Sequence, residues 1–78
     1  MKRYEIIQEI FLPCSGGLVQ DRRTIEERTL VSPERYVRGL YRDERRASYL
    51  HSTRDGSAIY EVVFDAGGRH RYTFTELP

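Results

Sequence analysis

Only one segment of this 78-residue chain, residues 32–46 (SPERYVRGLYRDERR), has the periodicity of an amphipathic helix. At about 100° per residue its apolar side chains fall on one side: Tyr36, Val37, Leu40 and Tyr41. Ser32, Pro33 and Glu34 form a strong helix start. Because the rest of the chain reads as strands, this one helix must cover whatever core the strands build.

A second stripe runs along the opposite side of the same predicted helix. Its members are arginines spaced three, four and three residues apart: Arg35, Arg38, Arg42 and Arg45. Like charges one turn apart repel each other, so the stripe requires acidic neighbours, solvent or a polyanion. Guanidinium groups suit phosphate and carboxylate, which makes these four residues the candidate anion or nucleic-acid contacts. The net charge is only +1, and twelve arginines are spread over the whole chain.

Two strands precede the helix in this interpretation. Residues 2–11 carry apolar side chains on both faces, Tyr4, Ile6 and Ile10 on one and Ile7 and Phe11 on the other, which is typical of a central strand. A turn follows at residues 13–17. Residues 18–31 are polar and form the return strand of a hairpin, with a bulge or fraying expected near residues 21–23.

The last third of the sequence predicts a three-stranded meander. Asp55-Gly56 is a type I′ hairpin turn, which places Arg54 opposite Ser57 and the following pairs in register with them. The next turn contains Ala66-Gly67-Gly68. A three-residue loop there opposes Val62 with Tyr72 and keeps the aromatic side chains on one face, so this register is predicted over a one-residue slip.

The predicted fold is α+β, a single antiparallel sheet of about five strands with one helix packed on one face, in the order β-β-α-β-β-β. Residues 1–78 form a single small domain. The far face of the sheet is mixed, with Leu50, Ile59 and Val63 among polar residues. One helix covers a five-stranded sheet poorly, so these three are the candidate self-association residues.

No catalytic or metal-binding pattern stands out in the sequence. Cys14, His51 and His70 lack metal-ligand spacing, and the predicted register separates the two histidines by roughly 16 Å. Cys14 lies in a glycine-rich turn without a histidine placed beside it, whereas a thiol nucleophile needs such a base. No cofactor is expected.

These observations predict a small cytoplasmic, non-enzymatic protein-interaction module that self-associates, most simply as a homodimer. The alternative is a nucleic-acid-binding accessory protein that uses the arginine-striped helix. A second alternative is a thiol-dependent small-molecule binder or enzyme that uses Cys14. No signal peptide is expected, because the first residues alternate charged and apolar side chains. No apolar run is long enough to span a membrane, and no membrane partner is expected.

Overall fold

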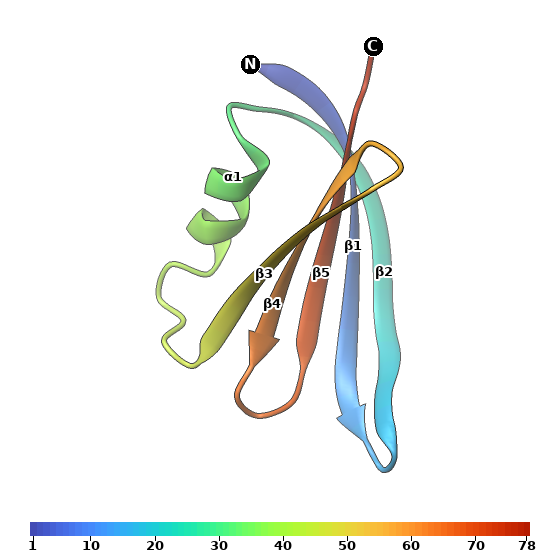
Figure 1. The fold of residues 1–78 in the computed structure, drawn as a ribbon, viewed down its shortest axis with the longest axis vertical. Helices are drawn as coiled ribbons and strands as arrows, with labels where there is room; N and C mark the ends of the chain where they lie inside the picture. Colours follow the sequence, from blue (N-terminus) through green and yellow to red (C-terminus); the bar gives the residue numbers. More distant parts are fainter.

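The computed structural model describes all 78 residues. Its elements are β1 (Lys2–Cys14), β2 (Gly17–Leu30), α1 (Pro33–Leu40), β3 (Ala47–Arg54), β4 (Ser57–Phe64) and β5 (Arg69–Glu76). The strands form one antiparallel sheet in the order β2-β1-β5-β4-β3. Figure 1 shows α1 on one side of this sheet and nothing on the other. The predicted fold class and element order are confirmed.

The N-terminal hairpin follows the prediction closely. β1 lies between β2 and β5, so the strand with two apolar faces is indeed internal. Ile10 pairs with Arg22 while Phe11 pairs with Gln20, which leaves Asp21 as the extra residue of a β-bulge. The bulge lies within the stretch where the sequence predicted one.

The register of the β3–β4 hairpin is also confirmed. Arg54 pairs with Ser57, and Tyr49 pairs with Val62. The two turn residues have left-handed backbone angles, with φ of 52° at Asp55 and 84° at Gly56. These angles are the ones that a type I′ turn requires.

The predicted register of β4 with β5 is wrong by two residues. Val62 pairs with His70, and Tyr60 pairs with Tyr72. The Phe64 N–H donates to the Gly68 carbonyl, so these two residues close the hairpin loop. The loop therefore has three residues as expected, but it begins at Asp65 and ends at Gly67, whose φ is 109°. Because a shift of two residues keeps every side chain on its own face, the predicted aromatic face survives the error.

The helix is much shorter than the predicted segment of residues 32–46. Ser32 caps its N-terminus by accepting a hydrogen bond from the backbone N–H of Arg35, and the helix ends at Leu40. Helical stability in proteins comes mainly from packing of the apolar face. Residues 42–46 (RDERR) offer no apolar side chain to the sheet, so the helix has no reason to continue.

The core lies between α1 and the sheet. Its five buried members are Ile6, Val37, Val62, Tyr72 and Phe74. Phe74 is the centre of an aromatic group, with edge-to-face contacts to Tyr36 at 6.1 Å and Tyr60 at 5.8 Å between ring centroids. One helical residue, Val37, is completely buried, so the helix is held mainly by one side chain and its aromatic neighbours.

Candidate interaction surface

The sheet face opposite α1 carries no second layer, and we call it the open face. The registers place on it the alternate residues of each strand that do not point to the core. Its central residues form cross-strand rows, which can be followed from β4 to β2. All five strands contribute to this face, and no other element of the chain covers it (Figure 1).

The middle row of the open face alternates in charge from strand to strand. It consists of Glu61 on β4, Arg71 on β5, Glu9 on β1 and Arg23 on β2, and we call it the charged row. Arg71 Nε lies 3.3 Å from Glu61 Oε2, and its Nη1 lies 3.6 Å from Glu9 Oε1. The carboxylate side chains are only 15% and 19% exposed, respectively. These ions are partly removed from water, where pairing contributes more than it does at a fully exposed surface.

Two arginines on the open face, one in the charged row and one next to it, have donors that pairing within the chain does not use. Arg69 also reaches Glu61, at 3.3 Å, but its Nε is buried without a hydrogen-bond partner. Arg23, at the β2 end of the row, is exposed and forms no ion pair. Two guanidinium groups on this face therefore retain unused donors.

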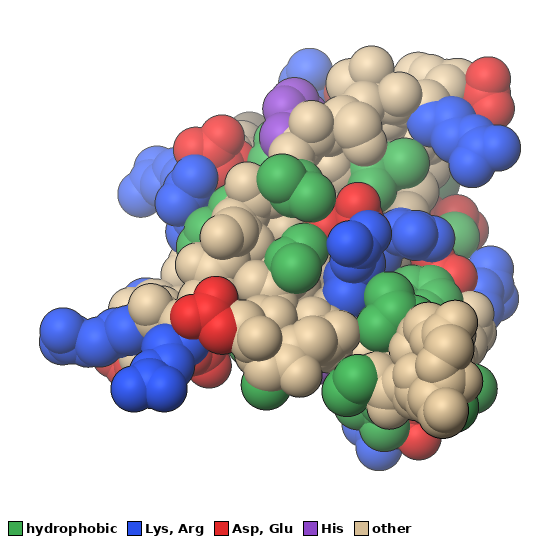
Figure 2. All heavy atoms as spheres, turned by 60° about the horizontal axis from the view of Figure 1, so that its bottom comes forward, with side chains coloured by type: hydrophobic (Ala, Val, Ile, Leu, Met, Phe, Trp, Pro, Cys, Tyr) green, Lys and Arg blue, Asp and Glu red, His purple; other side chains and the backbone are tan.

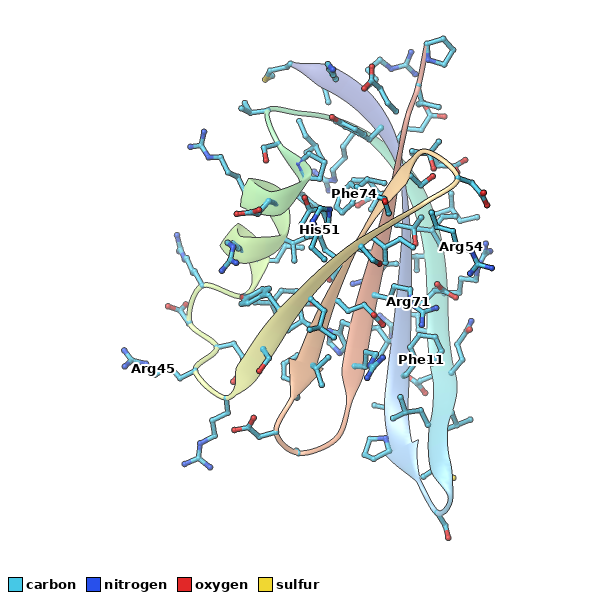
Figure 3. All side chains as sticks on the ribbon, viewed as in Figure 1. Phe11, Arg45, His51, Arg54, Arg71 and Phe74 are labelled. Atoms are coloured by element: carbon cyan, nitrogen blue, oxygen red, sulfur yellow. The ribbon has the colours of Figure 1, made fainter.

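Apolar side chains flank the charged row on both sides. One flanking row contains Ile59, Thr73, Ile7 and Ile25, and the other contains Val63, Arg69 and Phe11. The guanidinium of Arg71 stacks over the Phe11 ring at 5.0 Å, and the two side chains lie together on the sheet in Figure 3. The open face thus combines paired charge with apolar contact area.

The β3 side of the open face is hollowed. The hollow has a volume of about 500 Å³, and Ile59, Glu61, Arg71 and Thr73 contribute to its lining together with Glu9. Its wall is completed by residues at the turn between β3 and β4: Ser52, Thr53, Arg54, Asp55 and Ser57. Ile59 is its single apolar residue, so the hollow suits a segment that presents both polar and apolar groups.

The three predicted self-association residues lie together on the open face. Ile59 and Val63 are half-buried and flank Glu61 along β4, and Leu50 lies opposite Glu61 on β3. Leu50 is half exposed. Figure 2 shows hydrophobic side chains at the surface in groups separated by charged side chains rather than as one continuous patch. The charged row and its flanking rows give the open face the same mixture of charged and apolar side chains.

β2 and β3 are the two edge strands of the sheet, and β2 is the longer of them. Every residue of β2 except Leu30 is exposed, and its outer backbone edge has no neighbouring strand. Its exposed apolar side chains are Leu18, Val19 and Ile25. An edge of this length is a template for pairing with another chain.

The structure separates the members of the predicted arginine stripe. Arg35 and Arg38 are in α1, whereas Arg42 and Arg45 lie beyond its end. Arg38 pairs with Glu34 at 3.4 Å and stacks over the Tyr49 ring at 4.6 Å. The other three form no ion pair, and Arg45 points away from the fold (Figure 3). A continuous helical stripe is therefore a wrong prediction, because the helix ends between its second and third members.

The residues considered for thiol or metal chemistry are dispersed. Cys14 is exposed at the end of β1. His51 stacks on Tyr60 at 4.6 Å, and His70 Nδ1 lies 2.6 Å from the Tyr41 hydroxyl. The observed register brings the two histidines to an offset of two residues across two strands, about 12 Å. No group of three or more side chains that could hold a metal ion occurs in the structure.

A chain of hydrogen bonds crosses the helix-facing side of the sheet. Thr24 Oγ1 donates to Gln8 Oε1, and Gln8 Nε2 donates to the Tyr72 hydroxyl. When Tyr72 donates to Tyr41 and Tyr41 donates to His70 Nδ1, His70 is neutral, because a protonated Nδ1 could not accept. Burial lowers the pKa of His70 and, together with the Tyr72 hydrogen bond, raises the pKa of Tyr41. Both shifts favour this neutral arrangement.

No family model, curated protein or solved structure matches this chain. None of its helices has the length and apolar character needed to cross a membrane.

The charged row was not found from the sequence, because the predicted β4–β5 register placed Thr73 rather than Arg71 opposite Glu61. The opposite charges of Glu9, Glu61 and Arg71 were present in the sequence, but they alternate only once the order of the strands places Arg71 between the two carboxylates.

Proposed function

We propose that this protein is a small cytoplasmic, non-enzymatic interaction module that self-associates through the open face of its sheet. The observation that carries the proposal is the charged row. Its partly buried carboxylates and guanidinium groups lie between two rows that contain apolar side chains. Charge complementarity between such groups favours one partner and fixes its register, and the flanking apolar side chains add contact area.

The small core supports the same proposal. Only five of the 78 residues are buried, which is little for a domain that must offset the entropy of ordering its chain. Association is a common remedy in domains of this size. The open face offers further apolar area, since Ile25 is 55% exposed and Leu50 is 50% exposed.

Sedimentation equilibrium between about 5 and 500 µM tests the proposal. We expect a species of twice the 9.2 kDa chain mass, and a monomer over the whole range would contradict self-association. Ile25→Lys places a charge on the open face and should weaken the dimer. Leu40→Lys is the matched control, because Leu40 is 52% exposed but lies at the end of α1.

One observation favours the alternative, a nucleic-acid-binding accessory protein. Arg35, Arg42 and Arg45 are exposed and form no ion pair with a carboxylate, so their charges are free for a polyanion. If four phosphates are neutralised, the logarithm of the binding constant should fall with the logarithm of salt concentration with a slope of about −3 to −4. The fourfold change of Arg35, Arg38, Arg42 and Arg45 to Gln should then abolish binding. No binding at about 10 µM would exclude this function.

The thiol-dependent alternative rests on the exposure of Cys14 alone. A thiol nucleophile needs a base within hydrogen-bond reach, and both histidines contact tyrosine rings. We therefore give this alternative no further role in the proposed function.

A further inference from the structure

We infer that the partner of the open face is a second copy of this chain, packed face to face about a two-fold axis. The axis runs parallel to the strands. It lies in the plane between the two open faces, level with the space between β5 and β1. This inference rests on the proposed self-association and adds the geometry of the dimer. It follows from the order of charges in the charged row, whose members lie on four adjacent strands.

The signs in the charged row select this axis. Two-fold rotation about it places β4 of one copy over β2 of the other, and β5 over β1. Glu61 then faces Arg23 of the second copy, and Arg71 faces Glu9 of the second copy. A two-fold axis perpendicular to the strands would instead place Glu61 over Glu61 and Arg71 over Arg71. Because a two-fold interface brings a surface against itself, only the first orientation places every ion of the charged row opposite an ion of the other sign.

The flanking rows agree with the same orientation. On one side of the charged row, Ile59 faces Ile25 of the second copy, so two apolar side chains meet. On the other side, Arg69 faces Phe11 of the second copy. The face of an aromatic ring attracts a guanidinium group, and Arg71 already makes such a contact with Phe11 within one chain.

The hollow receives the edge strand in this arrangement. β2 of the second copy lies over β4, next to β3, above the Ile59 and Glu61 side chains that line the hollow. Its Arg23 and Ile25 are the exposed side chains that point there. Packed sheets cross at about −30°, so the match is closest at the Arg71–Glu9 contacts beside the axis.

Two adjacent arginines provide a matched test. Arg22 and Arg23 are both exposed and form no ion pair, but Arg22 lies opposite Ile10 on the helix-facing side, whereas Arg23 lies opposite Glu9 on the open face. Sedimentation equilibrium is measured for Arg23→Glu, Arg22→Glu and the unchanged protein, each at 50 and 500 mM NaCl. Since Arg23→Glu also sets two like charges opposite each other within the chain, Arg23→Gln is included, and circular dichroism verifies that each variant is folded.

We expect Arg23→Glu to raise the dimer dissociation constant at least about 100-fold, because it creates two symmetric like-charge contacts. Arg23→Gln should raise it about tenfold, and Arg22→Glu less than about threefold. Residual dimers of Arg23→Glu should strengthen at high salt, in contrast to the unchanged protein. Equal dimerisation of Arg22→Glu and Arg23→Glu would overturn this geometry while leaving self-association in place. A monomer in every sample would overturn the proposed function as well.

Discussion

The two faces of the sheet are built from alternate residues of the same strands, yet they are stabilised in different ways. The helix-facing side excludes water from Ile6, Val62 and Phe74, which are at most 1% exposed. The open face keeps its charges in partly exposed pairs, with Arg71 35% exposed between Glu9 and Glu61. Apolar burial on one face therefore provides the fold, whereas the other face keeps paired charges that no second layer covers.

The largest difference between the faces should appear when an aromatic side chain is removed from each. Phe74→Ala leaves a cavity at the centre of the aromatic group and should lower the free energy of unfolding by about 3–5 kcal/mol. Phe11→Ala on the open face should cost clearly less, about 1 kcal/mol, because Phe11 is only half-buried. Urea denaturation measures both values. Equal losses would contradict the division between a packed and an open face.

Two carboxylates on the open face provide a comparison of intermediate size. Glu61 accepts from both Arg69 and Arg71 and is 15% exposed. Glu27 pairs with Arg3 at 2.7 Å and is 60% exposed. We expect Glu61→Gln to lower the free energy of unfolding by about 1–2 kcal/mol. Glu27→Gln should lower it by less than about 0.5 kcal/mol. Chemical denaturation at low protein concentration separates these effects from dimerisation, and a reversed order would show that burial does not strengthen the row.

The pH dependence of stability tests the hydrogen-bond chain on the helix-facing side. Burial lowers the pKa of His70 from its usual 6.5, so the unfolded chain binds a proton more readily than the folded one. Stability should therefore fall as the pH drops through 6.5 toward the lowered pKa of His70. Thermal melting of His70→Asn from pH 8 to pH 5 should lack this component. His51→Asn is the control, because His51 is not part of this hydrogen-bond chain. If His70→Asn leaves the pH profile unchanged, His70 is not the group that makes stability fall at low pH.

The smallest effect is expected at Cys14. Its side chain is exposed at the end of β1, and substitutions at exposed sites usually change stability by less than about 0.5 kcal/mol. Cys14→Ser should leave both the melting temperature and the dimer dissociation constant unchanged. Loss of association in this variant would restore the thiol to a functional role.

Local signals were the part of the fold that the sequence predicted well. Asp55-Gly56 set the β3–β4 register, because left-handed backbone angles are possible at few residue pairs. Ser32 and Pro33 marked the helix start correctly. The end of the helix was missed, because charged residues 42–46 continue the period of a helix without providing anything that packs.

Long-range arrangement was the part that the sequence could not provide. The three-residue loop that contains Gly67 could begin at Asp65 or at Ala66, and both choices bury the same face of the sheet. The hydrophobic pattern alone therefore did not fix the β4–β5 register. The pairing of β1 with β5 depends on the order of strands far apart in the chain. The contact of Arg71 with Glu9 depends on this pairing, and its contact with Glu61 depends on the β4–β5 register. The charged row needs both contacts, and for this reason it became visible only in the structure.

A dilution series followed by amide ¹H–¹⁵N NMR tests the central claim most directly, because it reports at each residue where a second copy binds. Between about 20 and 500 µM, we predict concentration-dependent shifts centred on Glu9, Arg71 and Glu61 and extending to β2, with α1 and residues 41–46 unchanged. Shifts confined to α1 and residues 41–46, or no shifts at any concentration, would contradict the claim that the open face binds a second copy of this protein.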